Sequence, residues 1–157
     1  MDLVPANLAL ALAYEQTKEW DAAIERYRRV TAKAPNQAAA LNNLAYILAT
    51  QKDDAANALP LAKRAYAVSV QDPTIGDTLA WIQHLLGQDT DAEQTIVLSA
   101  RRLPNNAEVL MHAAFILAGT GKLADATKRL DDAVKIDPTL ESRQDIKELR
   151  TRLRPAK

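Results

Sequence analysis

One spacing constrains the fold of this chain more than any other feature: large apolar side chains return every thirty-four or thirty-five residues. Trp81 lies thirty-five residues after Tyr46 and thirty-four before Phe115, and Leu12 lies thirty-four before Tyr46. Self-similarity at a period of roughly 20–50 residues is the signature of repeat architectures. The chain is therefore expected to consist of stacked units, each burying its apolar face against its neighbours.

The composition predicts that these units are helical. Hydrophobic residues make up 48% of the 157 residues but aromatic residues only 4%, so the apolar content is mostly Ala and Leu, which are strong helix formers. Equal numbers of basic and acidic residues, 20 of each, leave no electrostatic footprint for a nucleic acid or an anionic membrane. The absence of Cys excludes disulfides, thiolate zinc sites and thiol nucleophiles, and it leaves the compartment open.

Each unit has the pattern of a helical hairpin: two faces at helical spacing, a polar or Gly-containing turn, and a stop near a proline. The four units span about 4–37, 38–72, 73–106 and 107–140. The second is one residue longer, and the extra residue must lie between Ala45 and Ala58, in the turn. We expect its second helix to begin near Asn57 or to bend at Pro60. Gly76 replaces a bulky residue of the neighbouring units, which predicts a close approach or a small void.

The two ends of the array differ. A helix over about 142–153 carries a narrow apolar stripe of Ile146, Leu149 and Leu153, as expected of a capping helix. Residues 141–157 have a net charge of plus three, which we interpret as solvated surface in preference to an anion site. At the other end Leu8, Leu10 and Leu12 are left uncovered, so either a repeat precedes them or this end self-associates.

The positions at which the four units agree resemble tetratricopeptide (TPR) repeats. The matching positions are Ala11, Ala45, Ala80 and Ala114; Ala23, Ala58, Ala92 and Ala126; and Pro35, Pro104 and Pro138, with Val70 in the corresponding place. The resemblance covers most of residues 4–140. It implies an all-α, right-handed superhelical solenoid of four helix-turn-helix hairpins plus the capping helix, forming a single domain over 1–157.

A narrower resemblance concerns the middle of the chain. The runs 40–46, 65–66 and 77–81 are similar to the C-terminal repeats of bacterial TPR lipoproteins associated with exopolysaccharide and PEP-CTERM export. That similarity implies a periplasmic or outer-membrane-associated protein, whereas the default is cytoplasmic. Residues 1–5 lack the features of a secretory signal, and Met1 is equally compatible with an added start in front of the first repeat.

The TPR resemblance places the first helix of each hairpin on the inner wall of a concave groove. It assigns Leu12, Tyr46, Trp81 and Phe115 to that wall as a ladder, one per repeat. Neighbouring positions one helical turn away complete the predicted partner-binding set: Asn42, Asn43, Asp77, Thr78, His84, Met111 and His112. These side chains offer aromatic faces and backbone-binding polar groups. The alternative is that the aromatic residues only pack between helices.

Other site chemistries are less well supported. Asn43 matches the second-repeat Asn of TPR domains that bind the C-terminal carboxylate of a chaperone. The other positions that bind the carboxylate in those domains are occupied here by residues without a positive charge: Leu8, Leu12, Thr74 and Thr78. We therefore reject a carboxylate clamp. His84 and His112, with Asp77 nearby, are expected to be ordinary polar surface, so we predict no metal and no cofactor. Asp53-Asp54 and Asp131-Asp132 are interpreted as solvated or helix-start charges.

These observations predict a non-catalytic module that binds a protein or peptide in its groove. No nucleophile elbow, phosphate loop or HExxH motif supports an enzyme. The alternative function is a structural spacer or self-assembly segment of a longer repeat protein, which the narrower resemblance would connect with exopolysaccharide export. Neither nucleic acid nor membrane insertion of this segment is expected.

Overall fold

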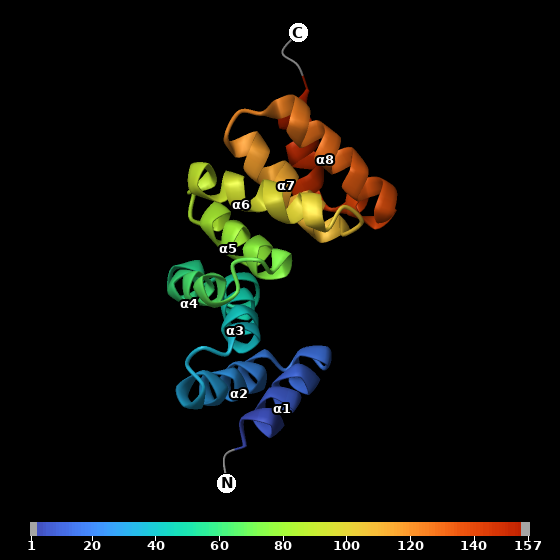
Figure 1. Ribbon diagram of the computed structural model, residues 1–157. Helices are drawn as coiled ribbons and strands as arrows, with labels where there is room; N and C mark the ends of the chain where they lie inside the picture. The colour runs from blue at the N-terminus through green and yellow to red at the C-terminus, as the bar shows by residue number, and fades with distance from the viewer. Residues whose placement is uncertain (1–2, 155–157) are drawn as a thin grey trace.

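The computed structural model describes residues 3–154. Met1, Asp2 and residues 155–157 lie outside the described part, so the prediction about an added start at Met1 concerns residues that are not described. Its elements are α1 (Val4–Gln16), α2 (Trp20–Lys33), α3 (Ala38–Gln51), α4 (Ala55–Val68), α5 (Pro73–Leu85), α6 (Asp89–Arg102), α7 (Ala107–Gly119), α8 (Leu123–Ile136), the short 3-10 helix η1 (Pro138–Ser142) and α9 (Gln144–Leu153). Helices α1 to α8 pair as four hairpins that follow one another from one end of the molecule to the other (Figure 1). The predicted all-α solenoid with a final capping helix is confirmed.

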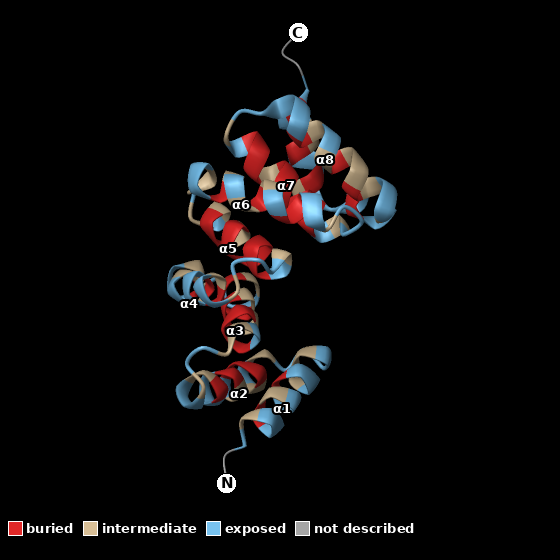
Figure 2. Cartoon of the chain, in the orientation of Figure 1, coloured by how far each residue is buried: buried red, intermediate tan, exposed pale blue. Residues whose placement is uncertain are grey.

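Small residues set the distance between the two helices of each hairpin. The alanines at the shared positions of the first and second helices are all fully buried; they are Ala11, Ala23, Ala45, Ala58, Ala80, Ala92, Ala114 and Ala126. Because Ala has only a methyl side chain, the helix backbones can approach closely and pack without a void. In Figure 2 the buried positions accordingly follow the faces on which neighbouring helices meet.

The turns within the hairpins explain the extra residue of the second unit. The Glu19 N–H donates to the Tyr14 carbonyl at 2.8 Å, and the third and fourth turns close in the same way, five residues apart. In the second turn the Asp54 N–H donates to the Leu48 carbonyl at 2.9 Å, six residues back. The prediction that this turn absorbs the extra residue is confirmed.

Each of these turns also requires a left-handed backbone residue. Gly87 and Gly121 provide it in the third and fourth turns, with φ of 72° and 81°. Lys18 and Asp53 hold the left-handed conformation in the first two turns, with φ of 60° and 52°. Since a side chain makes this conformation less favourable, the first two turns hold backbone strain that the glycine turns avoid.

Helix α4 begins two residues before the expected start near Asn57. Its N-cap is Asp54, whose Oδ1 accepts the Asn57 N–H at 3.3 Å and so satisfies one of the free donors of the first turn. Pro60 therefore lies inside the helix, on an exposed face in the second turn. The Asp54 cap therefore stabilises an earlier start of α4 than the position of Pro60 predicted.

Gly76 combines both outcomes expected for it. A Cβ there would lie only 2.7 Å from Ser99 Oγ of α6, so the helices approach closely at this point. Beside that contact, Gly76 also lines a surface cavity of about 210 Å³ together with Tyr66 and Thr95. A glycine lets α6 approach α5, but it does not fill the space alongside.

Helix α5 joins the two halves of the core. Leu79 and Ile82 pack into the apolar cluster of α1 to α4, whereas Ala80 packs into the cluster of α6 to α9. Helix α5 thus packs against the hairpins that precede it and against those that follow it.

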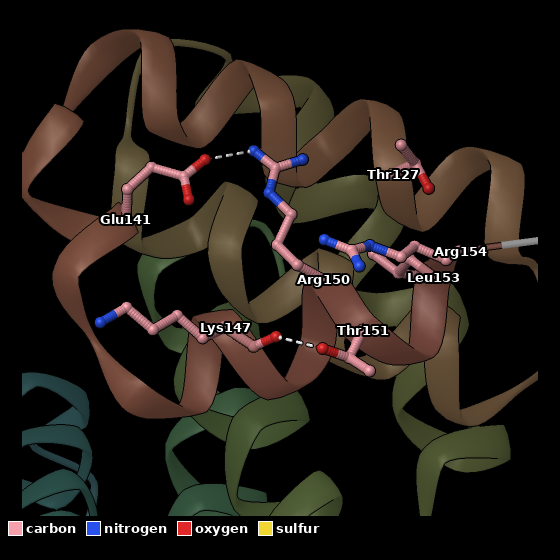
Figure 3. Close-up of a pocket in the computed structure, with 7 residues that line it drawn as sticks. All are labelled: Thr127, Glu141, Lys147, Arg150, Thr151, Leu153 and Arg154. Carbon is pink, nitrogen blue, oxygen red and sulfur yellow. Dashed lines mark hydrogen bonds and ion pairs between the residues drawn. The ribbon is translucent and has the colours of Figure 1, made fainter.

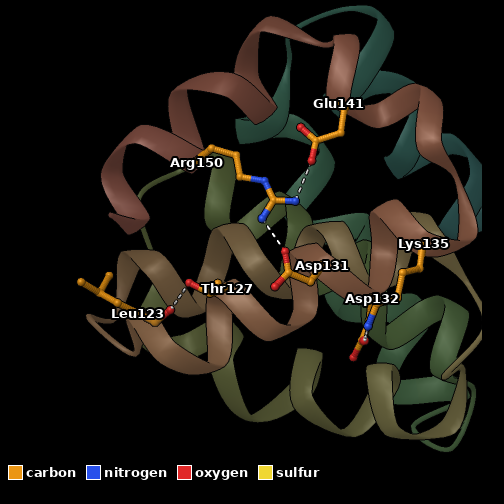
Figure 4. Close-up of polar contacts among 7 residues, drawn as sticks. All are labelled: Leu123, Thr127, Asp131, Asp132, Lys135, Glu141 and Arg150. Atoms are coloured by element: carbon orange, nitrogen blue, oxygen red, sulfur yellow. Dashed lines mark hydrogen bonds and ion pairs between the residues drawn. The ribbon is translucent and has the colours of Figure 1, made fainter. Parts of the chain in front are cut away.

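The capping helix α9 buries the predicted stripe: Ile146, Leu149 and Leu153 are all buried. It begins at Gln144, because the preceding residues form η1 with Leu140 buried. Arg150 of α9 bonds Asp131 of α8 and Glu141 of η1 (Figure 4). The Asp131 side chain is 46% exposed, so it is partly solvated as expected, but it also forms an ion-pair anchor between α8 and the cap.

A cavity of about 550 Å³ lies beside this anchor and is lined by residues of α8, η1 and α9 (Figure 3). Its cations are Lys147, Arg150 and Arg154. Arg150 already binds two carboxylates, and Glu141 itself lines the cavity. This pairing weakens the positive potential and disfavours a specific anion site.

Across residues 3–154, none of the helices combines the length and the apolar character that crossing a membrane requires.

Replacing Ile146 by Ala tests how far the cap stabilises the array. Ile146 is fully buried, so Ile146→Ala should lower the free energy of unfolding by about 2–5 kcal/mol, measured by urea denaturation. Lys147→Ala, at an exposed position of the same helix, is the control and should change it by less than about 0.5 kcal/mol. Equal effects of the two substitutions would contradict a packed cap.

Candidate partner-binding groove

The first helices of the second, third and fourth hairpins, α3, α5 and α7, together line two adjoining cavities. The first cavity has a volume of about 220 Å³ and the second about 320 Å³. Tyr46 of α3 and Glu108 of α7 line both. The cavities therefore form one groove whose wall comes mainly from three successive repeats, with Glu15 of α1 added at the first cavity.

A hydrogen bond crosses this groove between the two cavities. The Tyr46 hydroxyl donates to Glu108 Oε1, although the two residues are 62 positions apart and belong to repeats that are not neighbours. Burial and the adjacent Glu108 carboxylate raise the pKa of Tyr46 above its ordinary value. Tyr46 thus keeps its proton and remains a donor at neutral pH.

The floor of the groove contains a buried acid–histidine pair. His112 Nδ1 of α7 lies 2.9 Å from Oδ1 and 3.1 Å from Oδ2 of Asp77 in α5. His112 is only 2% exposed, so the expectation that both histidines are polar surface is wrong for this one. The physical reason is that Asp77, one repeat earlier, supplies the partner that a buried imidazole needs.

Trp81 is the centre of the aromatic contacts. Its ring stacks on that of His112 with centroids 4.0 Å apart and an interplanar angle of 16°. The His84 ring is stacked at 5.0 Å, and the Phe115 ring meets the indole edge-on at 5.8 Å. The predicted ladder is therefore interrupted by imidazoles, which fix the indole in place while Trp81 stays half-buried.

His84 is oriented from outside the groove. Its Nδ1 hydrogen-bonds Asp89 Oδ1 at the start of α6. A Cβ at Gly119 would lie 1.9 Å from Asp89 Oδ2, so only glycine at this position leaves room for that carboxylate. Gly119 thereby supports the orientation of His84, which in turn contacts Trp81 and Phe115.

The structure brings together most of the predicted set. Asn42, Asn43, Asp77 and Thr78 line the first cavity, Trp81, Met111 and His112 line the second, and Tyr46 lines both. His84 and Phe115 pack on Trp81 and line neither cavity. Leu12 is 42% exposed on α1 and lines neither cavity, although Glu15 of the same helix lines the first one.

Several lining residues were not predicted. They are Glu15, Thr74, Asn106, Glu108 and Val109 in the first cavity and Ala49, Thr50, Asp53, Leu85, Glu108 and Arg143 in the second. Repeat register could have indicated Glu108, since it occupies the position of Thr74 one repeat later. Arg143 lies beyond the repeats, so no periodic signal marks it.

Within residues 3–154, no group of three or more His, Asp or Glu side chains is placed to hold a metal ion.

A double-mutant cycle measures the Asp77–His112 pair. Asp77→Ala leaves a buried imidazole nitrogen without its partner and should lower the free energy of unfolding by about 1–3 kcal/mol. The double variant with His112→Ala should be less destabilised than the sum of the two single variants, with a coupling of about 0.5–3 kcal/mol by urea denaturation. Additive effects would show that the pair contributes nothing. Thr74→Ala, exposed on the same helix, is the control.

Comparison with known proteins was made by sequence and by structure. The family model described as tetratricopeptide repeat matches residues 8–74. A TPR repeat-containing protein of Pseudomonas aeruginosa is 35% identical over 85 residues, which make up 54% of this chain and 14% of that protein. The chain thus spans only a small part of the length of the curated relative that it matches.

Solved structures share the fold at low sequence identity. MamA of Desulfovibrio magneticus RS-1, from residue 41 to its end, is 12% identical with a TM-score of 0.71, covering 96% of this chain and 92% of that one. YrrB, described as a TPR protein with an unusual peptide-binding site, is 15% identical with a TM-score of 0.73, covering 97% and 85%. A thermophilic TPR protein of Thermus thermophilus is 20% identical with a TM-score of 0.67, covering 96% and 79%.

None of these descriptions mentions a lipoprotein or polysaccharide export, so that narrower resemblance stays a prediction. The sequence match and the fold of the described chain agree on the repeat type. Residues 8–74 match the tetratricopeptide repeat (TPR) family, and the described chain has the fold of solved TPR proteins.

Proposed function

We propose that this chain is a non-catalytic scaffold, a single TPR domain over 1–157, that binds a segment of a partner protein in the groove of α3, α5 and α7. TPR domains generally mediate protein and peptide binding, and solenoids use their concave surfaces for it. The observation that carries the proposal is the accessible indole of Trp81. It lines the second cavity while His112 and His84 hold its ring in place.

A fixed, half-buried Trp is well suited to anchor a ligand. Its large surface is held in one orientation, so little conformational freedom is lost when a partner covers it. Met111 and Leu85 add apolar lining beside it, and Asp53 and Arg143 add polar lining. The partner segment would place an apolar side chain here and continue past the Tyr46–Glu108 bond into the first cavity.

Replacing Trp81 tests this assignment. The probe is a peptide selected for binding to the native chain from a random-sequence display library, with affinity measured by isothermal titration calorimetry. Trp81→Ala should weaken binding by about 2 kcal/mol or more, roughly 30-fold. Val68→Ala, exposed at the end of α4, is the control and should leave affinity unchanged. An unchanged affinity in a Trp81→Ala variant with native helical circular dichroism would overturn the assignment.

Self-association is the second candidate, favoured by the apolar surface of α1. Leu3, Leu10 and Leu12 are each more than 40% exposed. A second copy of the chain could cover these side chains and gain the hydrophobic free energy of their burial. Light scattering over a range of concentrations decides: a constant monomer mass excludes self-association, and a mass that rises with concentration supports it.

A further inference from the structure

The first cavity of the groove differs from the second in its charge. Its lining includes the carboxylates of Glu15, Asp77 and Glu108, and it contains no Lys, Arg or His. Most of the remaining lining residues carry an amide or a hydroxyl group. Arg143, the nearest cation named in the groove, lies in the second cavity and is bonded to Asp145 at 2.6 Å and 3.1 Å. The lining of the first cavity therefore carries three carboxylates and no cation, while Arg143 acts on Glu108 from the second cavity and His112 bonds Asp77.

A chain of hydrogen bonds fixes the direction of one amide in this cavity. Asn43 Nδ2 donates to the Tyr27 hydroxyl at 2.9 Å, which leaves Asn43 Oδ1 as an acceptor. Asn42 Nδ2 lies 3.4 Å from that oxygen and donates to it. The Tyr27 hydroxyl in turn interacts with the Glu15 carboxylate, which together with burial raises the pKa of Tyr27. Because the Asn42 Nδ2 group is used in this bond, the orientation of the Asn42 amide is fixed and its Oδ1 points away from Asn43 Oδ1.

This arrangement leaves two buried acceptors without donors. Asn42 is 6% exposed, and its Oδ1 has no hydrogen-bond partner in the described chain. Glu15 Oε1 is also buried and makes no hydrogen bond, although the Tyr27 hydroxyl interacts with the same carboxylate. Both residues line the first cavity. A buried acceptor without a donor is destabilising, so a ligand that supplies N–H groups here would remove that cost.

The size of the cavity limits the ligand to one side chain. Its volume of about 220 Å³ is below the roughly 300–1,000 Å³ of pockets that hold drug-sized molecules. A Lys ammonium carries three donors and an Arg guanidinium five, and neither carries an acceptor that would face the carboxylates. A neutral amide would bring an acceptor into a cavity already rich in them.

We propose that the first cavity binds a Lys or Arg side chain of the partner segment, whose N–H groups bond Asn42 Oδ1 and the Glu15 carboxylate. This inference rests on the proposed function and adds a specificity to it: an apolar residue on Trp81 and a basic residue in the first cavity. Asp77 and Glu108 contribute through their charge, because their oxygens already bond His112 and Tyr46.

The test uses the peptide selected from the display library. The selected sequences should share a Lys or Arg at one fixed position, and replacing it by norleucine, which keeps the stem and removes the ammonium group, should weaken binding about tenfold or more. Glu15→Gln in the chain should reduce the preference for Lys over norleucine, whereas Trp81→Ala should weaken both peptides by a similar factor. Acetylating the peptide N-terminus should have no effect.

Three results would overturn the proposal. One is equal affinity of the Lys and norleucine peptides while Trp81→Ala still weakens both; this would leave the groove intact and remove the basic-residue assignment. The second is a loss on N-terminal acetylation without a loss for norleucine, which would assign the site to a terminal amine. The third is a preference for Lys that Glu15→Gln and Asn42→Ala both leave unchanged. The norleucine comparison uses the unmodified chain, so it does not depend on how the variants fold.

Discussion

The structure depends on one repeated contact, the close approach of two alanine-lined helix faces within each hairpin. Ala45 with Ala58, and Ala80 with Ala92, are fully buried where the first and second helices meet. Because these contacts hold each hairpin together from within, many side chains on the inner faces of α3, α5 and α7 are not required for that packing. A solenoid built in this way presents a continuous row of side chains from successive repeats, which a compact domain would bury in its core.

The inner face is nevertheless ordered by contacts between repeats. Tyr46 reaches Glu108 across the groove, and Asp77 pairs with His112, on which Trp81 stacks. These bonds join α3, α5 and α7 to one another, so a partner would meet a surface that is already arranged. A preorganised surface loses less conformational freedom on binding than a flexible one. The same side chains therefore contribute to the stability of the solenoid and to the geometry of the groove.

The fold could be predicted from the sequence because it depends on local and periodic information. The alanine positions, the turns and the apolar stripe of the capping helix recur at fixed spacing, and each was found where expected. The start of α4 was missed because Asp54 caps it, an interaction of one side chain with the first turn. The left-handed conformation of Lys18 was missed as well, because Lys has no preference for it and only the glycines at the equivalent positions of the third and fourth turns mark it.

The site was less predictable because its contacts join repeats. His112 was expected at the surface, yet its partner Asp77 lies thirty-five residues earlier and only the stacking of α5 on α7 brings them together. Glu108 and Arg143 were missed for the same reason: one bonds across two repeats, and the other comes from the segment before the cap. The direction of the Asn42 amide follows from a chain of bonds through Asn43 and Tyr27, which no spacing in the sequence describes.

The most direct test of the central claim, that a partner lies in the groove of α3, α5 and α7, is a nitrogen-15 NMR titration of the native chain with the selected peptide. The chain has two tryptophans, Trp20 on α2 and Trp81 in the groove, so it gives two indole N–H signals that serve as an internal comparison. The account predicts that the Trp81 signal and the backbone amides of α3, α5 and α7 shift on binding while the Trp20 signal stays in place. A stationary Trp81 signal, with shifts confined to α2, α4 and α6, would place the partner on the opposite face and contradict the account.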